Sequence, residues 1–145
     1  LMANVQAFCS LFMTEALDAT HDLSVDTIKA ALYLTTANIG LHTTQYTSTG
    51  EVSGLNYVAG GIVVDSTRPP LVAGKVTYWT PGADIVFSNV TLLTSFNAAL
   101  LYNASKSNKA LGVWTFSAIT VNLSNFTLRV PSNTVGAALF RWKSQ

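Results

Sequence analysis

Hydrophobic positions recur with helical spacing only near the N-terminus. They are Val5, Phe8, Cys9, Phe12, Met13, Ala16 and Leu17, three or four residues apart. This pattern predicts an amphipathic helix over about residues 4–18, with Asn4 as its N-cap. Cys9, the single cysteine, is expected to be a small buried residue of that helix.

Beyond Asp22 the pattern changes to the alternation of a β-strand. In residues 27–36, for example, Ile28, Ala30 and Leu32 fall on one face and polar or aromatic residues fall on the other. Gly60-Gly61 predicts a bulge or a close backbone approach. The predicted strands cover residues 27–36, 55–65, 74–80, 84–92, 96–104, 109–121, 125–130 and 137–142, and residues 38–53 are predicted to be a Thr-rich loop.

No second helical segment separates these strands, so βαβ units are excluded. We therefore predict an all-β fold, a β-sandwich or jelly roll of about eight strands carrying one N-terminal amphipathic helix. The sandwich is expected to span residues 26–142 of a single domain, 1–145. A chain of this length buries enough surface to fold without a metal or a disulfide.

Composition narrows the function classes. Charged residues are 10% of the chain, against about 25% in an average soluble domain. The formal net charge is +1, and Thr and Ser together make up 31 of 145 residues. These values argue against nucleic acid as a partner, and no apolar run reaches the 18 or so residues of a membrane helix. A surface with so little charge favours a protein that is packed against copies of a partner.

Titratable side chains are few. His21 is adjacent to Asp22 and close to Ser24, which could orient a His beside a nucleophile. The alternative, which we favour, is that Asp22 or Ser24 shapes a turn. His21 and His42 could bind a metal with Asp65 or Asp84, but the spacing matches no metal motif. We expect no catalytic, cofactor or metal site and no enzymatic activity.

Four aromatic residues are candidates for a carbohydrate platform: Tyr78, Trp79, Trp114 and Trp142. Tyr78 and Trp79 are adjacent in a strand and point to opposite faces, so only one of them can be in the core. Trp142 lies near the C-terminus, where it can cover a sheet edge or a partner surface. A core or interface role is favoured over sugar binding.

Two segments are predicted to contact a partner. One is the loop 43–53, with Tyr46 and Glu51, and the other is the C-terminal group Phe140, Arg141 and Trp142. Arg141 and Lys143 could form salt bridges with an acidic partner surface.

Several short motifs follow the predicted helix in a fixed order. They are Asp26-Thr27-Ile28-Lys29-Ala30-Ala31-Leu32-Tyr33, Thr44-Gln45-Tyr46-Thr47, Glu51-Val52-Ser53-Gly54, Tyr57-Val58-Ala59-Gly60-Gly61, Ala99-Leu100-Leu101-Tyr102-Asn103 and Ser107-Asn108-Lys109-Ala110. Over about residues 8–140 this order resembles a family of small virion proteins of tailed bacteriophages. The resemblance implies no catalytic residues.

Within such phages, small β-sandwich proteins commonly serve as capsid decoration (cement) proteins. The resemblance therefore implies a structural protein that bridges major capsid subunits, is made in the bacterial cytoplasm and resides on the head surface. A small homo-oligomer, dimer or trimer, is expected. The alternative is a tail or baseplate component with a host-surface or carbohydrate-binding role.

Overall fold

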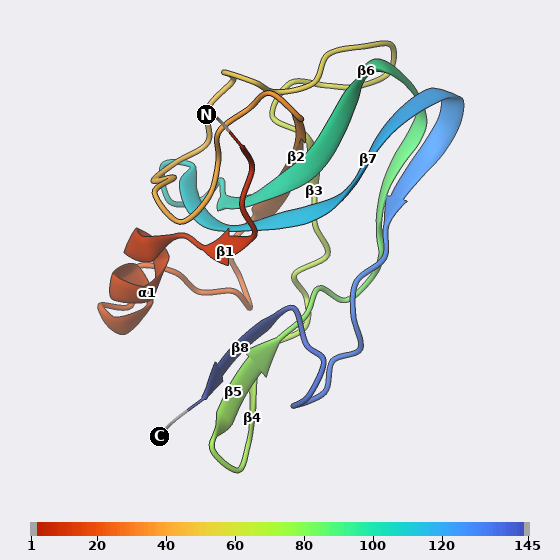
Figure 1. Ribbon diagram of the computed structural model, residues 1–145. Coiled ribbons are helices and arrows are strands. Elements are labelled where there is room, and N and C mark those ends of the chain that lie inside the picture. The colour runs from red at the N-terminus through yellow and green to blue at the C-terminus, as the bar shows by residue number, and fades with distance from the viewer. Residues whose placement is uncertain (1–2, 144–145) are drawn as a thin grey trace.

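The computed structural model describes residues 3–143, so the two residues at each end of the predicted domain lie outside it. The described chain is mostly β, as predicted, and forms two antiparallel sheets with one short helix (Figure 1). The larger sheet has the strand order β1-β7-β6-β2-β3 and the small sheet has the order β4-β5-β8. The elements are β1 (Ala7–Phe8), α1 (Ser10–Leu17), β2 (Ile28–Leu34), β3 (Ile62–Val63), β4 (Leu71–Ala73), β5 (Val76–Trp79), β6 (Ile85–Asn103), β7 (Lys109–Leu128) and β8 (Phe140–Lys143).

A long hairpin of β6 and β7 is the framework of the larger sheet (Figure 1). The sequence pattern predicted four strands here, with breaks at 93–95 and 122–124, and this was wrong. The chain passes these positions in irregular pairing between Phe87 and Phe96, with Asn89 and Leu123 at positive φ. Bulges bend a strand without ending it, so polar residues that resemble turns remain inside the hairpin.

The N-terminal helix is shorter than predicted, because residues 4–9 are extended. Ala7 and Phe8 pair with β7, and the Val5 N–H donates to the Ile39 carbonyl. Asn4 caps nothing: its Nδ2 donates to the Leu34 carbonyl and to Asn97 Oδ1. Cys9 is buried as expected, but as the N-cap residue of α1. Burial, and secondarily the Glu15 charge, raises the pKa of its thiol to about 12.

Most of the predicted strand 55–65 is a set of turns, and only Ile62 and Val63 are paired with β2. The glycine pair explains the difference, because Gly60 and Gly61 have φ values of +92° and +75°. A Cβ on Gly61 would stand 1.8 Å from the Ala30 carbonyl oxygen. The predicted close backbone approach is therefore confirmed.

The core lies around the β6–β7 hairpin and β2, and in the run Ala98–Asn103 of β6 both faces of the strand are buried. Phe96, Phe116 and Phe126 pack together, with the Phe96 and Phe126 centroids 4.9 Å apart. Phe87 extends this cluster toward the loop through Tyr57, at 5.9 Å. Aliphatic side chains of the central strands complete the core: Ile28, Leu32, Leu92, Leu100, Leu101 and Leu111.

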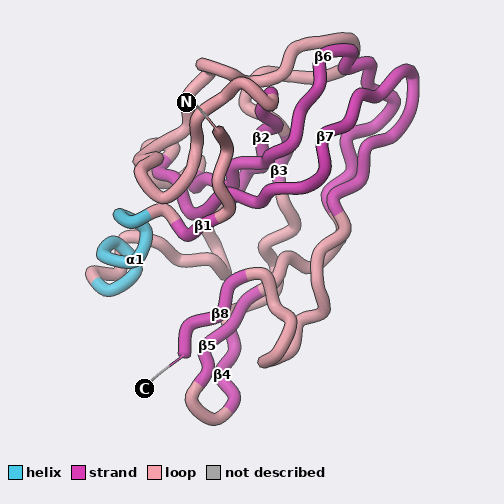
Figure 2. The backbone as a smooth tube through the Cα atoms, in the orientation of Figure 1, coloured by secondary structure: helices cyan, strands magenta, loops and turns pink. Residues whose placement is uncertain are grey.

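The small sheet is separate from the larger one in hydrogen bonding, and loop segments connect the two (Figure 2). The strands predicted at 74–80 and 137–142 are present as β5, which is shorter at both ends, and as β8, which begins three residues later and ends one residue later. β4 was not predicted, although it directly follows Pro69-Pro70 and is joined to β5 by a tight turn at Gly74. β4 and β8 are the two edges of this sheet.

Candidate functional site

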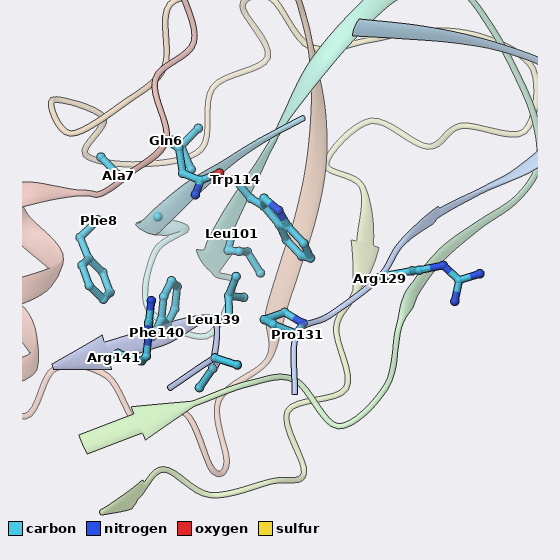
Figure 3. Close-up of a pocket in the computed structure, with 14 residues that line it drawn as sticks. Gln6, Ala7, Phe8, Leu101, Trp114, Arg129, Pro131, Leu139, Phe140 and Arg141 are labelled. Atoms are coloured by element: carbon cyan, nitrogen blue, oxygen red, sulfur yellow. The ribbon is translucent and has the colours of Figure 1, made fainter. Parts of the chain in front are cut away.

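Two pockets lie where the small sheet meets the rest of the molecule. The larger, about 470 Å³, opens between β1, β7 and the segment 129–141 (Figure 3). The second, about 350 Å³, opens between α1 and the small sheet. Phe8, Phe140 and Arg141 line both. We call the second pocket the α1 groove.

The α1 groove has one helical wall and one sheet wall. Phe12, Ala16 and Leu23 belong to the first wall, and Thr77, Trp79 and Trp142 belong to the second. In the small sheet Thr77 pairs with Trp142, and Trp79 pairs with Phe140. Directly paired residues of antiparallel strands share a face, so one face of the small sheet is turned toward α1.

Aromatic rings form the floor of the groove around Phe140. Its ring centroid lies 5.0 Å from Phe8, 5.7 Å from Phe12 and 5.8 Å from Trp79. These distances fall in the range of favourable aromatic pairs. Gly112 of β7 allows the close fit, because a Cβ there would lie 3.1 Å from the Phe140 ring. The floor thus joins the two sheets and α1.

The rim of the groove is apolar and exposed. Trp142 lines the groove and is 44% exposed. Beside the lining, Val72 of β4, which pairs with Thr77, is 70% exposed, and Leu17, which follows Ala16 in α1, is 80% exposed. Isolated apolar residues on a surface are ordinary, but a group of them beside an apolar pocket is typical of interaction sites.

The three C-terminal residues predicted as partner contacts all line this groove. Phe140 is half-buried in the floor, whereas Arg141 and Trp142 are exposed. The Arg141 guanidinium donates from Nη1 to the Gly136 carbonyl at 2.6 Å, which ties β8 to the preceding loop. Their contact with a partner stays a prediction.

The other two predicted contact residues, Tyr46 and Glu51, line neither pocket. The Tyr46 hydroxyl donates to Glu51 Oε2 at 2.6 Å. Glu51 Oε1 accepts from the Tyr57 hydroxyl and the Gly60 N–H, both at 2.7 Å. A carboxylate with three donors has a clear structural role within this chain, while its contact with a partner remains untested.

Tyrosine hydroxyls surround Glu51. Burial raises the pKa of Tyr46, Tyr57 and Tyr33, and the Glu51 charge adds to the shift in each case. The pKa of Tyr102 is raised by the same two causes. Each of these four hydroxyls donates a hydrogen bond: Tyr33 to the Thr47 carbonyl, Tyr102 to the Gly60 carbonyl, and Tyr46 and Tyr57 to Glu51.

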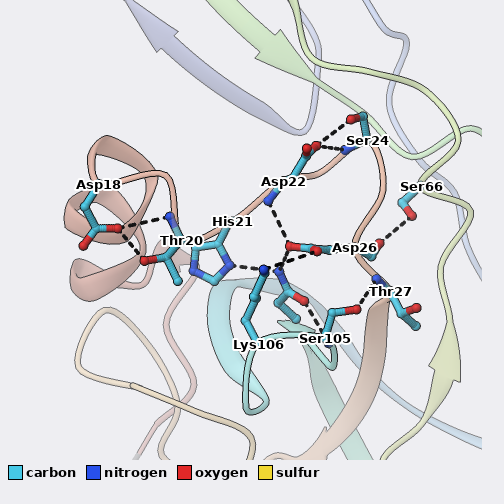
Figure 4. Close-up of polar contacts among 11 residues, drawn as sticks. Asp18, Thr20, His21, Asp22, Ser24, Asp26, Thr27, Ser66, Ser105 and Lys106 are labelled. Atoms are coloured by element: carbon cyan, nitrogen blue, oxygen red, sulfur yellow. Dashed lines mark hydrogen bonds and ion pairs between the residues drawn. The ribbon is translucent and has the colours of Figure 1, made fainter.

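His21 lies in a buried polar network (Figure 4). Asn103 Oδ1 accepts from the Ser105 N–H, so its Nδ2 donates to His21 Nδ1 at 3.0 Å and to Asp26 at 2.7 Å. His21 Nε2 therefore carries the proton and faces Glu15 Oε1 at 3.3 Å. Both ring nitrogens of His21 are thus engaged within this network, and the Ser24 hydroxyl is bonded to Asp22 instead of His21.

Asp22 forms the turn that we favoured over a catalytic role. Its Oδ1 accepts from the Ser24 N–H at 3.0 Å and from the Ser24 hydroxyl at 2.5 Å (Figure 4). These hydrogen bonds lower the pKa of the Asp22 carboxyl. Asp65 makes the same kind of turn with Thr67. Within residues 3–143, no three His, Cys, Asp or Glu side chains are placed to hold a metal ion.

Sequence reasoning missed the helical wall and the β4 part of the rim. Phe12 was assigned only to a helix face, and nothing in the pattern places that face opposite β5 and β8. Val72 lay in no predicted strand. One local signal could have revealed it, namely a short apolar run between Pro69-Pro70 and Gly74-Lys75 before another strand.

Comparison of the chain with protein-family models, curated proteins and solved structures found no match. In the part of the chain that the structure describes, no helix is long and apolar enough to cross a membrane.

Proposed function

We propose that this protein is a structural component that binds copies of a partner in a large assembly, as a decoration protein on the head of a tailed bacteriophage. The carrying observation is the exposed apolar rim of the α1 groove, in a chain with only 10% charged residues. The motif resemblance supplies the phage capsid as the assembly and the major capsid protein as the partner.

The physical logic of a clamp agrees with this architecture. Each square ångström of apolar surface removed from water contributes about 25 cal/mol, and the entropy cost of association offsets much of that gain. A shell repeats the same site many times, so a modest affinity per copy gives a large total stabilisation. Such a role requires a stiff scaffold and an adhesive surface rather than a reaction centre.

The β-sandwich or jelly-roll classification is part of the proposal. Its support is the bend of the β6–β7 hairpin, which folds over the phenylalanine cluster and reaches β2 through Tyr57. The Tyr57 ring packs on Phe87, and its hydroxyl accepts from the Leu32 N–H at 3.0 Å. Two layers of one curved sheet would then enclose the core.

The copy number in purified particles tests the proposal. Quantitative mass spectrometry measures the amount of this protein against the major capsid protein. We expect a simple ratio of small integers. A few copies per particle would assign the protein to the tail or baseplate instead, and absence from the particle would overturn the virion role.

A further inference from the structure

The charges of the small sheet are all of one sign. Lys75, Arg141 and Lys143 lie in or between its strands, and residues 71–79 and 140–143 contain no Asp or Glu. All three cations are exposed. Among the described residues, ion pairs within 4.0 Å join His21 and Lys109 to Glu15 and Lys106 to Asp26, and none includes a cation of the small sheet.

Of these cations Arg141 lines the α1 groove, and Lys143 follows it two residues later in the edge strand β8. The inside of the groove is apolar. Trp79, at the floor, is 2% exposed, whereas Trp142 and Val72 on the same sheet face are largely open to solvent. A volume of about 350 Å³ is at the small end of ligand pockets and suits one or two side chains. An apolar anchor entering it would remove the exposed Trp142 face from water.

We infer that the α1 groove and the small sheet together bind an acidic segment of a partner protein. One or two apolar side chains of that segment enter the groove, and its carboxylates pair with Arg141 and Lys143. This inference rests on the proposed function, in which the segment belongs to the partner in the assembly. The binding surface is the α1 groove with the small sheet, and the recognised segment is both apolar and acidic.

The two walls of the groove fix the orientation of the segment. Asp22 lies at the helical wall, and its carboxylate already accepts a hydrogen bond from the Ser24 N–H. Partner carboxylates are repelled from that wall and attracted to the β8 edge, where Arg141 and Lys143 alternate with Trp142. The guanidinium of Arg141 uses Nη1 for Gly136, which leaves its other N–H groups for a bidentate contact with a carboxylate.

Other occupants fit less well. Edge pairing of β8 with a second copy in antiparallel register would place Arg141 opposite Arg141 or Lys143 of that copy, and like charges directly opposite are destabilising. Single-stranded nucleic acid would match the cations and Trp142, but it stacks on open aromatic faces and does not fill an apolar groove whose aromatic floor is buried.

A random linear peptide library displayed on yeast, selected on the purified full chain, tests the inference directly. We expect enriched peptides with an apolar or aromatic pair flanked by Asp and Glu. Selection on Arg141→Gln/Lys143→Gln should lose the acidic preference, and selection on Lys106→Gln, a matched neutralisation outside the small sheet, should keep it. Neutral or basic consensus peptides, or no enrichment, would overturn the inference.

Isothermal titration with the enriched peptide makes the test quantitative. Arg141→Gln/Lys143→Gln and Trp142→Ala should each raise the Kd about tenfold, or about 1.4 kcal/mol, while Lys106→Gln stays within about twofold. Circular dichroism confirms that each variant is folded. Equal peptide affinity in all variants would refute the assigned surface. Tighter binding of a single-stranded DNA oligonucleotide than of the peptide would also refute it. So would sedimentation that shows a dimer whose interface covers the groove.

Rebinding to particles from which the protein has been stripped separates the two proposals. If the wild type rebinds and the groove variants rebind equally well, the inference fails and the decoration role stands. If the wild type does not rebind but the peptide results hold, the decoration role fails and the groove assignment stands. Loss of rebinding only in the groove variants supports both.

Discussion

Glu51 organises a long segment that has little regular structure. Its carboxylate connects distant residues of that segment, because it accepts hydrogen bonds from the hydroxyls of Tyr46 and Tyr57 and from the Gly60 N–H. Glu51 also lies opposite Tyr33 of β2, and the Tyr57 hydroxyl accepts from the β2 residue Leu32. The loop is therefore fixed to the sheet through one charged group, and each hydrogen bond to such a group contributes about 1.5–3 kcal/mol.

Replacement of that carboxylate should cost more than the loss of any one donor. We expect Glu51→Ala to lower the free energy of unfolding by roughly 2–4 kcal/mol, because two hydroxyls and one buried N–H lose their acceptor. Urea denaturation measures the change. The control Tyr46→Phe removes a single donor and should cost about 1 kcal/mol. Unchanged urea midpoints in both variants would contradict the role of the network.

The tyrosines around Glu51 predict a loss of stability in alkali. Burial raises the pKa of Tyr33, Tyr46, Tyr57 and Tyr102 in the folded state above the ordinary value of 10.0. Below pH 10 the folded and the unfolded state both keep these protons, so the tyrosines contribute their full stabilisation. Above pH 10 the unfolded chain ionises first, and stability falls as the pH rises toward the folded-state pKa values.

We therefore expect unfolding and tyrosinate formation to coincide in an alkaline titration, measured by circular dichroism and ultraviolet absorbance. Tyr57→Phe removes one of the shifted hydroxyls, and the pH dependence of its unfolding free energy should be shallower by about one proton. Tyrosinate absorbance that develops fully before any loss of structure would show that these hydroxyls are not held protonated by the fold.

At the level of the elements, alternation predicted which residues are β but not where strands end. β2 follows a simple apolar alternation and was predicted within two residues at each end. The β6–β7 hairpin was divided into four strands, with breaks at the polar stretches 93–95 and 122–124. Whether a polar residue turns the chain or bulges out of a ladder depends on the opposite strand, which lies far away in sequence.

The prediction of a helix over the whole N-terminal segment failed for a related reason. The spacing of Val5, Phe8 and Phe12 is helical, yet β7 offers an unpaired edge to residues 7–8. Tertiary hydrogen bonding therefore overrides the local pattern over one turn, and the helix begins only after Cys9. Helical spacing in the sequence therefore gives a helix only where no strand of the fold pairs with the same residues.

Gly61 fixes the position of the short edge strand β3 against β2. We expect Gly61→Ala to destabilise the protein by at least about 3 kcal/mol, because its Cβ would stand 1.8 Å from the Ala30 carbonyl oxygen and its φ is +75°. Thermal unfolding measures this. Gly136→Ala is the matched control, since a Cβ there meets nothing within 4 Å. Similar Tm values for the two variants would contradict this account of β3.

At the scale of the whole molecule, the candidate site is a product of the junction between the two sheets. The aromatic and basic character of Phe140, Arg141 and Trp142 marked them as candidate contacts, and the structure brings all three to the groove. Their contact with a partner stays a prediction. The residues that face them across the groove could not be predicted, because Phe12 reaches β8 only through the placement of α1 after β1. Long-range placement of this kind leaves no mark in a local pattern.

Phe140 is the residue that holds the junction, so it should control the coupling of the small sheet to the larger one. Its ring meets Phe8, Phe12 and Trp79 and packs on Gly112, and we expect Phe140→Ala to cost roughly 2–4 kcal/mol. Hydrogen exchange should then accelerate in β4, β5 and β8 while β2 keeps its protection, since local opening follows the weakest contacts.

The neighbouring substitution Trp142→Ala provides the comparison, because that side chain is 44% exposed and outside the floor of the groove. It should leave the exchange pattern of both sheets unchanged. Equal acceleration in β2 and β5 of Phe140→Ala would mean that the two sheets unfold as one unit. That outcome would contradict the role of Phe140 as the residue that couples two separately opening sheets.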